Sequence, residues 1–326
     1  MQEYNSGKRL TKRSVKCFGT GGNMIYTVTF NPAIDYAIGV EKLEPGMTNR
    51  ATFEQLLPGG KGLNVSIILS NLGIDNIALG FIAGFTGAEI KRSFERLGGK
   101  SDFIELEKGI SRINVKIKSI KETEINAVGP VIDDKALSQL MDKLNSLKSG
   151  DVLILAGSIP ASLPDSLYSD IMEMLSDRDI VIAVDATKDL LVNVLPHKPF
   201  LVKPNNHELG EIFGVTLKTR EEVVPYAKKL QEKGAGNVLV SMAGEGAVLV
   251  TQNGDVLMSE APKGTVKNSV GAGDSMVAGF IAGWYEKHDY SHAFKMGLSA
   301  GSASAFSEVL ATKPEIEKVY NSFELL

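Results

Sequence analysis

The second half of the chain alternates short apolar runs with longer amphipathic stretches. The runs are rich in β-branched residues, as buried parallel strands are, and the stretches between them have helical length and spacing. The runs lie at 151–155, 180–184, 200–203 and 237–241, and the helical stretches at 165–177, 206–213 and 219–233. Repeated strand–helix–strand units predict an α/β fold with a doubly wound, mainly parallel sheet flanked by helices. Because ligands bind such sheets beyond the carboxyl ends of the strands, functional residues are expected just after each run.

Two segments, at about 32–57 and 102–129, follow a different pattern. Residues 113–119 alternate apolar and polar side chains, and residues 122–126 follow after a short turn. This alternation is typical of half-buried antiparallel strands. We therefore predict a small inserted β-sheet whose open face suits a lid over the site or a homodimer contact. The end of the chain is predicted to be helical at 274–287, about 291–308 and 313–322.

The first 23 residues are basic, whereas the rest of the chain is acidic. The 326-residue chain has a net charge of −4, and residues 1–23 hold five Lys or Arg against one Glu, which leaves −8 for residues 24–326. The basic segment lacks the apolar core and the cleavage site of an export signal and ends in a glycine-rich join. We interpret it as an appended leader or an unstructured extension, with a nucleic-acid-binding arm as the alternative. Residues 24–326 are expected to form one domain that includes the lid segments.

Composition excludes several classes of protein. The chain is 43% hydrophobic, which is ample for a buried core, and no apolar run reaches the roughly 18 residues of a membrane span. The only cysteine, Cys17, cannot form an internal disulfide, which favours a reducing compartment and a cytoplasmic location. The four histidines lack the spacing of metal ligands. Neither nucleic acid nor a membrane is an expected partner.

A glycine-rich turn at 268–275 opens one of the predicted helices. The amides of Gly271, Ala272 and Gly273 at a helix amino terminus can bind an anion, since the helix dipole adds positive charge there. Asp274 lies in the same turn. If a phosphoryl group were bound to these amides, Asp274 could accept the proton of an attacking hydroxyl group. The alternative is that Asp274 only caps the helix.

A second glycine-rich turn, at 58–66, opens a helix that extends to about residue 72. Its spacing does not fit a P-loop, and the glycines from residue 271 do not fit a dinucleotide fingerprint, which would require glycine in place of Met276. What remains is a turn, with Gly59 and Gly60, that presents backbone amides, Lys61 and Asn64 to a polar, anionic ligand. The alternative is a tight turn with a solvated lysine.

Two further stretches carry residues suited to a nucleotide. Lys203 could reach a phosphate of ATP, and Asn205 and Glu208 offer oxygen atoms for Mg²⁺ held largely through water. A capping box, in which Asn and Glu close the start of a helix, is the alternative for this pair. The loop at 241–247 suits a ribose or phosphates, and a simple hairpin turn explains it nearly as well. The residues of interest in this loop are Ser241, Gly244, Glu245 and Gly246.

Three charged residues lie on or near the predicted lid. Asp35 follows the first apolar run, at 25–30, and its carboxylate could accept hydrogen bonds from sugar hydroxyl groups at the carboxyl end of that strand. Arg112 and Arg50 lie on the inserted sheet. A solvated surface position is the alternative for each arginine.

Three motifs, in this order along the chain, resemble those of the PfkB (ribokinase-like) carbohydrate kinase family. They are GGKGLNVS at 59–66, KPNNHE at 203–208 and NSVGAGDS at 268–275, and the resemblance covers about residues 24–322. NPAIDY and SRINVK, at 31–36 and 111–116, look like the branch of the family that phosphorylates phosphosugars. The resemblance implies ATP-dependent phosphorylation of fructose 1-phosphate at its C6 hydroxyl group, giving fructose 1,6-bisphosphate. Tagatose 6-phosphate as substrate is the first alternative, then another sugar or nucleoside kinase of this fold, and last a non-enzymatic sugar-phosphate sensor.

The resemblance also implies a role for each motif residue. Asp274 becomes the catalytic base, and Gly271–Gly273 become the anion hole for the transferred phosphoryl group. Mg-ATP would contact Lys203, Asn205, Glu208 and the loop at 241–247. Sugar hydroxyl groups would contact Asp35, Gly60 and Asn64, with Gly59 in the same turn, and the sugar phosphate would contact Lys61, Arg112 and Arg50. Two positions depart from the family pattern: Ala243 precedes Gly244 in the nucleotide loop, and Asn268 stands where Asp is usual.

Overall fold

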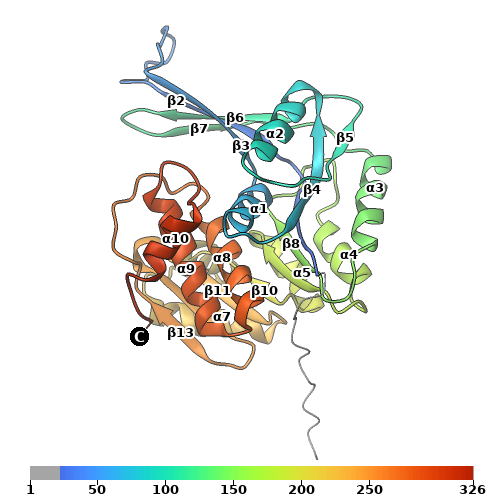
Figure 1. Cartoon of the computed structure of the whole chain (residues 1–326), viewed down its shortest axis with the longest axis vertical. Coiled ribbons are helices and arrows are strands. Elements are labelled where there is room, and N and C mark those ends of the chain that lie inside the picture. The colour runs from blue at the N-terminus through green and yellow to red at the C-terminus, as the bar shows by residue number, and fades with distance from the viewer. Residues whose placement is uncertain (1–22, 326) are drawn as a thin grey trace, which may run out of the picture.

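The computed structural model describes residues 23–325 and confirms the predicted doubly wound α/β architecture (Figure 1). Within this range, nine strands form one large sheet and four strands form a second, small sheet. The predicted leader at 1–23, which includes Cys17, lies outside the described residues apart from Asn23.

The large sheet has the strand order β13-β12-β11-β10-β9-β8-β1-β4-β5. All neighbours from β11 to β5 pair in parallel, and the edge formed by β11, β12 and β13 is antiparallel. The four runs predicted to be parallel strands correspond to β8, β9, β10 and β11. The bounds are β1 (Ile25–Thr29), β4 (Asn76–Ala83), β5 (Ile104–Leu106), β8 (Val152–Ala156), β9 (Val181–Asp185), β10 (Leu201–Val202), β11 (Asn237–Ser241), β12 (Ala247–Val250) and β13 (Val256–Ser259).

Helices cover both faces of the large sheet. The helices of one face are α3 (Asp134–Asn145), α4 (Leu167–Met174), α5 (Lys188–Val194), α6 (Asn206–Phe213) and α7 (Arg220–Glu232). Those of the other face are α1 (Lys61–Asn71), α8 (Ala272–Lys287), α9 (Tyr290–Phe306) and α10 (Lys313–Tyr320). Within residues 23–325, no helix combines the length and the hydropathy needed to cross a membrane.

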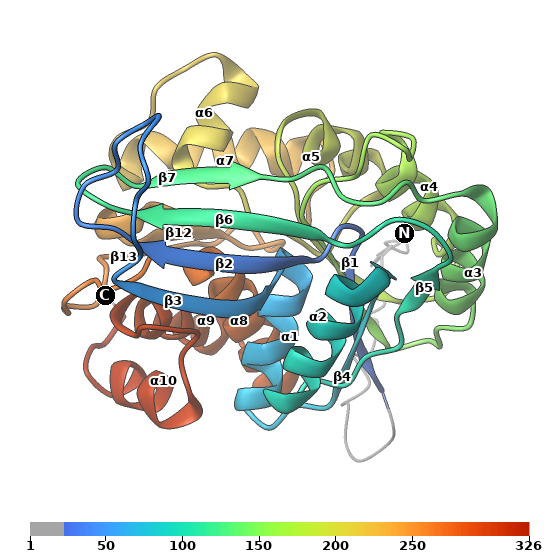
Figure 2. The ribbon, with the colours of Figure 1, turned by 90° about the horizontal axis from the view of Figure 1, so that it is seen from above.

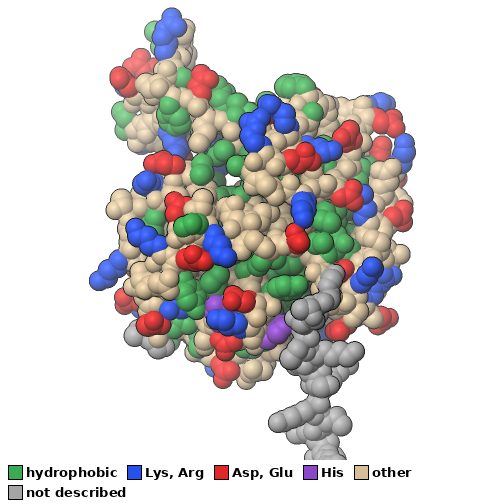
Figure 3. Space-filling view, in the orientation of Figure 1, with side chains coloured by type: hydrophobic (Ala, Val, Ile, Leu, Met, Phe, Trp, Pro, Cys, Tyr) green, Lys and Arg blue, Asp and Glu red, His purple; other side chains and the backbone are tan. Residues whose placement is uncertain are grey.

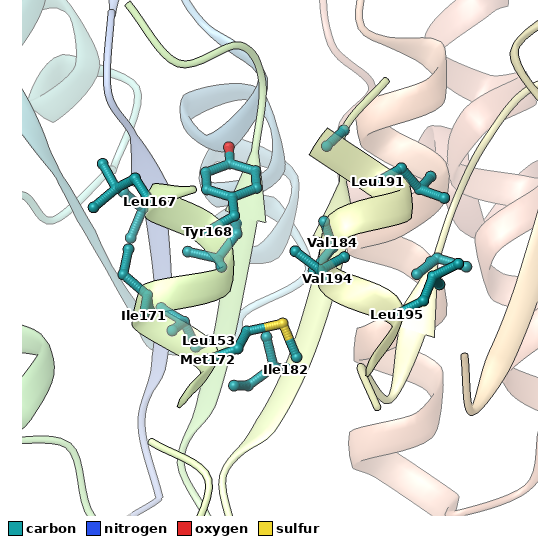
Figure 4. Close-up of a cluster of buried hydrophobic side chains, with 14 of the residues drawn as sticks. Leu153, Leu167, Tyr168, Ile171, Met172, Ile182, Val184, Leu191, Val194 and Leu195 are labelled. Atoms are coloured by element: carbon teal, nitrogen blue, oxygen red, sulfur yellow. The ribbon is translucent and has the colours of Figure 1, made fainter. Parts of the chain in front are cut away.

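The core is built from strand residues that are buried on both sides. All five residues of β8 are buried, which explains why its sequence is a continuous apolar run with no alternation. Figure 4 shows part of the core on the α4 and α5 side, where Met172 of α4 lies near Leu153 and Val194 of α5 lies near Val184. Apolar burial on both faces therefore stabilises the sheet that carries the site.

Several elements were not among those predicted. The helices α2 (Gly84–Arg96), α3 and α5 are present, and α5 has only seven residues, too few for a clear helical period. The segment 102–129 also does not belong wholly to the lid, because β5 pairs with β4 in the large sheet. A strand of three residues is too short to show by alternation which sheet it joins.

The small sheet has the order β3-β2-β6-β7 and is the predicted lid. Its strands are β2 (Ala33–Gly39), β3 (Phe53–Gly59), β6 (Arg112–Lys118) and β7 (Thr123–Asn126). Figures 1 and 2 show the four strands side by side, projecting from the body. The outer pairs are antiparallel as expected, but the central pair, β2 and β6, is parallel, because both strands leave the body in the same direction.

The two faces of the lid differ in polarity. One row across the sheet is apolar and consists of Leu56, Tyr36, Val115 and Ile125. The adjacent row, which faces the opposite way, includes Asp35 and Asn114. Side chains alternate between faces along a strand, so the lid has one polar face and one apolar face.

The apolar face of the lid is covered only at its inner end. There, Ile34 and Ile113 pack near Ile90 and Phe94 of α2. Farther out, Leu56 is 53% exposed and Ile125 is 57% exposed. The space-filling view shows the lid standing out from the body, with hydrophobic as well as charged side chains on its surface (Figure 3).

Candidate active site

The carboxyl ends of the central strands meet the amino end of α1 at a cavity of about 230 Å³. This is the edge where the strand–helix pattern predicted ligand binding. The residues that line the cavity include Thr29, Asn31, Lys61, Arg112, Ser158 and Asp185. They come from the body and from the lid, so the cavity lies where the two meet.

The first glycine turn brings Lys61 and Asn64 to this edge. Gly60 has φ +129°, which favours glycine, and a Cβ there would lie 2.7 Å from Cγ2 of Thr29. No side chain caps the amino end of α1, so its first amides stay open, as predicted. Asn64 donates a hydrogen bond of 2.8 Å to Oδ2 of Asp274. The two glycine motifs, far apart in sequence, are therefore in direct contact.

The second glycine turn places Asp274 in the first turn of α8. Gly271 has φ +78°, and a Cβ there would lie 2.7 Å from Cδ2 of Leu310. No side chain caps this helix among the described residues, and the Asp274 carboxylate accepts its hydrogen bond from Asn64. Capping is thus not what Asp274 does. Of the three amides predicted to bind an anion, that of Ala272 donates to the Ser269 carbonyl at 3.3 Å, and those of Gly271 and Gly273 remain open.

Asp274 is only 6% exposed, and its surroundings make it a better proton acceptor than an ordinary aspartate. Burial and then the negative charge of Asp185 raise the pKa of Asp274 to about 6, against the opposing effects of Lys61, Asn64 and Lys203. A carboxyl group with this pKa is ionised at neutral pH and accepts a proton more readily than a solvated one. These are the properties of a general base.

Asp185 is a residue of the site that the sequence analysis missed. It is the last residue of β9, fully buried, and its Oδ1 lies 3.0 Å from Nζ of Lys61 and 3.5 Å from Nζ of Lys203. Burial alone would raise the pKa of Asp185, but Lys203 and Lys61 together lower it. The signal was available, because Asp185 directly follows the apolar run 180–184, where functional residues were expected.

Lys61 and Lys203 are brought together by Asp185. Burial alone would lower the pKa of Lys61, but the charges of Asp185 and Asp274 raise it, so this lysine stays protonated. Lys203 is 4% exposed, and a Cβ on Gly273 would lie 3.3 Å from its Nζ. The ammonium group of Lys203 therefore stands beside the start of α8, and Asp185 links it to that of Lys61.

Asn205 and Glu208 form the capping box that was the alternative to metal binding. Oδ1 of Asn205 accepts from the amide of Glu208, and Oε2 of Glu208 accepts from the amide of Asn205, both at 2.8 Å. One carboxylate oxygen of Glu208 is left for water. No group of three His, Cys, Asp or Glu residues suited to a metal occurs among residues 23–325. The donor set fits Mg²⁺ held mainly by water and substrate phosphates.

The loop at 241–247 is the turn of the β11–β12 hairpin, which was the alternative reading of this sequence. Ser241 forms an isolated parallel β-bridge with Asn205, so this turn and the capping box lie side by side. Gly244 and Glu245 are exposed, and the Glu245 carbonyl accepts a hydrogen bond of 2.6 Å from Nη1 of Arg220. The contact of this loop with a nucleotide stays a prediction.

The lid contributes Asp35 and Arg112. Asp35 lies inside β2 rather than just after β1, with Oδ2 at 3.0 Å from Nζ of Lys116 and Oδ1 accepting from Asn114. It also packs against Gly59, where a Cβ would lie 2.5 Å from its Cγ. Lys116 was not predicted. It shares the polar face with Asp35, and the alternation of β6 was the signal for it.

Arg112 and Arg50, both predicted on the lid, occupy different places. Arg112 is half-buried at the cavity and donates from Nε to the Asn31 carbonyl at 3.0 Å, so it is not a solvated surface arginine. Burial lowers the pKa of Arg112, and Asp35 opposes this effect. Arg50 is exposed, near the far ends of β2 and β3, and lines a separate hollow there. Within one chain the structure does not bring it to the cavity.

A buried carboxylate, two lysines and open helix amides suit the transfer of an anionic group to a hydroxyl group. The carboxylate can remove the proton of the acceptor, and the cations and amides can stabilise charge on the transferred group. Arg112 offers a further cation from the lid for an anionic substrate.

Comparison with known proteins finds relatives over most of the chain. The model of the pfkB family carbohydrate kinases matches residues 26–316. A 1-phosphofructokinase of Bacillus subtilis is 46% identical over 91% of this chain and 97% of that protein. A D-tagatose-1-phosphate kinase of Bacillus licheniformis is 34% identical over 93% of this chain and 99% of that protein. The solved tetrameric inhibited form of phosphofructokinase-2 from Escherichia coli has a TM-score of 0.85 and 25% identity, covering 92% of this chain and 99% of that one.

Proposed function

The chain belongs to the pfkB family of carbohydrate kinases, and we propose that it transfers the γ-phosphoryl group of ATP to the C6 hydroxyl group of fructose 1-phosphate. The fold is the ribokinase-like one expected from the sequence. The relative named 1-phosphofructokinase, 46% identical over most of both chains, supports this substrate. The structural observation that carries the proposal is the meeting of Asp274, Lys203 and the open amides of α8 at one point.

The proposed reaction is a direct in-line transfer. The C6 hydroxyl oxygen forms a bond to the γ-phosphorus of ATP while the bond from that phosphorus to the bridging oxygen of ADP breaks. The hydroxyl proton moves to the carboxylate of Asp274, which is ionised above its pKa of about 6. The open amides of Gly271 and Gly273 and the ammonium group of Lys203 stabilise the charge that spreads over the phosphoryl oxygens.

The remaining predicted residues orient the substrates. Asp35, Gly60 and Asn64 would bind hydroxyl groups of the sugar, and Lys61 and Arg112 its phosphate. The lid would exclude water, which otherwise competes as the acceptor. Asn205 and Glu208 would hold Mg²⁺ through water, where the ion would neutralise phosphate charge. A cytoplasmic location is part of the same proposal.

Tagatose phosphates are the second candidate substrates. The first alternative from the sequence was tagatose 6-phosphate, but the relative from Bacillus licheniformis is named a D-tagatose-1-phosphate kinase. Its name places the phosphate on C1, as in fructose 1-phosphate. The 6-phosphate is therefore the less supported of the two tagatose phosphates.

A coupled ADP-release assay tests the function. Purified protein would be given ATP, Mg²⁺ and, in separate reactions, fructose 1-phosphate, tagatose 1-phosphate, tagatose 6-phosphate or fructose 6-phosphate. The expected result is the highest kcat/KM with fructose 1-phosphate. A higher value with a tagatose phosphate would move the assignment to that sugar. No ADP release above background with any sugar phosphate would favour the non-enzymatic sensor.

The apolar face of the lid is proposed to bind the lid of a second copy, giving a homodimer. Its outer part leaves Leu56 and Ile125 more than half exposed. A hollow lined by Ile38, Leu43 and Ile117 lies at the same end of the sheet. Exposed apolar patches of this kind mark association surfaces. The Escherichia coli phosphofructokinase-2 described above was solved as a tetramer, so a protein of this fold does associate.

A further inference from the structure

Asp185 has no part in the reaction as described, yet it is the most deeply buried charged residue among residues 23–325, with 0% of its surface exposed. It ends β9, a strand that lies between β8 and β10 in the large sheet. Its side chain lines the cavity. A charge is kept at such a position only if nearby groups balance it.

The groups that balance Asp185 come from the two sides of the site. Lys61 reaches its Oδ1 from the start of α1, at 3.0 Å, and Lys203 reaches the same oxygen from the end of β10, at 3.5 Å. The second oxygen, Oδ2, is buried without a hydrogen-bond partner among the described residues. The two lysines thus share a single carboxylate oxygen. Without that carboxylate, two ammonium groups this close would repel each other.

We propose that Asp185 is a positioning residue that holds Lys61 on the sugar-phosphate side and Lys203 on the ATP side. One buried carboxylate then fixes one cation for each substrate. The phosphate of the sugar and the phosphates of ATP are thereby both positioned relative to Oδ1 of Asp185. This inference rests on the proposed kinase function. The negative charge of Asp185 would by itself hinder phosphate binding. Its position, however, holds in place the two lysines that phosphate transfer uses.

The charge of Asp185 also acts on the base. The charged groups that act on Asp274 are Asp185, Lys61 and Lys203, and Asn64 adds a hydrogen bond. When Asp274 is ionised, the two carboxylates and the two ammonium groups balance. Loss of the Asp185 charge would leave one positive charge in excess, which would favour ionised Asp274 and attract phosphates more strongly.

Two variants separate the charge of Asp185 from its position. Asp185→Asn keeps the shape and removes the charge. We expect kcat to fall at least tenfold, KM for both substrates to fall at least threefold, and the acidic limb of the kcat/KM profile to move down by about one pH unit. Asp185→Glu keeps the charge and moves it by one methylene group. We expect its acidic limb and KM values to stay near wild type while kcat falls at least tenfold.

Asp151→Asn is the matched control. Asp151 is 4% exposed at the amino end of β8, away from the site, and its carboxylate accepts 2.8 Å hydrogen bonds from the amides of Met24 and Lys148. This variant is expected to lower the melting temperature and to leave the KM values and the acidic limb unchanged. A merely structural role of Asp185 would make Asp185→Asn behave in the same way.

Wild-type KM values and a wild-type acidic limb in Asp185→Asn would overturn the inference, as would a wild-type kcat in Asp185→Glu. If Asp185→Asn does not fold, Asp185→Glu carries the test alone. A wild-type protein with no kinase activity would refute the proposed function instead. In that case calorimetric binding of ATP decides on Asp185, because Asp185→Asn must bind ATP more tightly than wild type for the inference to stand.

Discussion

The large sheet and the small sheet present functional groups in different ways. The central strands of the large sheet are buried on both faces, and its charged site residues, Asp185 and Lys203, stand at or just after strand ends. The small sheet carries Asp35 and Lys116 within its strands, with Arg112 at the first position of β6. A strand covered on both sides cannot keep an unpaired charge at its centre, whereas a strand with one open face can carry a polar side chain at every second position. Chemistry is therefore found at the ends of one sheet and on the face of the other.

The largest effect is expected at the large sheet, from Asp274→Asn. The amide cannot accept the hydroxyl proton, so kcat should fall by about 10²–10⁴-fold, while ATP still binds because the lysines and the α8 amides remain. Steady-state kinetics and calorimetric ATP binding measure the two effects. The control is Asp170→Asn, which should not alter kcat. Asp170 is an exposed aspartate of α4 whose carboxylate accepts a hydrogen bond from the hydroxyl group of Ser166. Near-normal turnover of Asp274→Asn would refute its role as the base.

The corresponding change on the lid is Arg112→Ala. Loss of a charge-assisted contact should raise KM for fructose 1-phosphate by about 10–100-fold and leave KM for ATP nearly unchanged. The control is Arg92→Ala, which removes a surface arginine of α2 that is paired with Glu89. If KM for the sugar did not change, a neutral substrate would become the better hypothesis.

The pH dependence separates the two sheets further. Because the pKa of Asp274 is raised to about 6, the inactive protonated form accumulates as the pH falls below that value. The wild-type kcat/KM should therefore drop about tenfold per pH unit well below pH 6 and level off above it. Arg112→Ala should keep the limb at the same pH, since Arg112 is not among the groups that shift Asp274. A limb near pH 4 in wild type would contradict the buried position of Asp274.

The smallest effect on catalysis is expected from Leu56→Lys on the apolar face of the lid. A charge on the proposed dimer contact should shift the protein from dimer to monomer in sedimentation velocity, with little change in the melting temperature. Val131→Lys, at a residue that is 78% exposed in the connection between β7 and α3, is the control and should not change the oligomeric state. If Leu56→Lys has the same sedimentation coefficient as a dimeric wild type, the dimer contact lies elsewhere. If the wild-type protein is itself a monomer, the proposed homodimer is refuted.

Much of the fold follows from hydrophobic pattern alone. The strands β8, β9 and β11 are apolar runs buried on both sides, and their flanking helices have a clear amphipathic period, so both appear in the sequence. The short elements β5 and α5 span too few residues for any period to be read. The pairing of β2 with β6 also could not be foreseen, because it depends on how two distant segments leave the body.

The site was only partly predictable for a related reason. The two glycine turns can be recognised in the sequence, because Gly60 and Gly271 adopt positive φ angles that favour glycine at the starts of their helices. No comparable sequence motif identifies Asp185. A single carboxylate after an apolar run is common, and only the three-dimensional structure shows that Lys61 and Lys203 converge on it. Asn205 and Glu208 show the opposite case, because their spacing fits a capping box and a metal site equally well.

The lid is attached to the body by four short connections, at residues 30–32, 60, 107–111 and 127–133. Its strands are hydrogen-bonded to one another along their lengths, so a hinge motion at these connections would move the sheet as a rigid body. Asp35 and Arg112 lie on the neighbouring strands β2 and β6 and would travel together. If Asp35 binds the sugar hydroxyl groups and Arg112 the sugar phosphate, as proposed, such a motion would form or break both contacts in a single step, and release of the bisphosphate product would depend on movement of the whole lid.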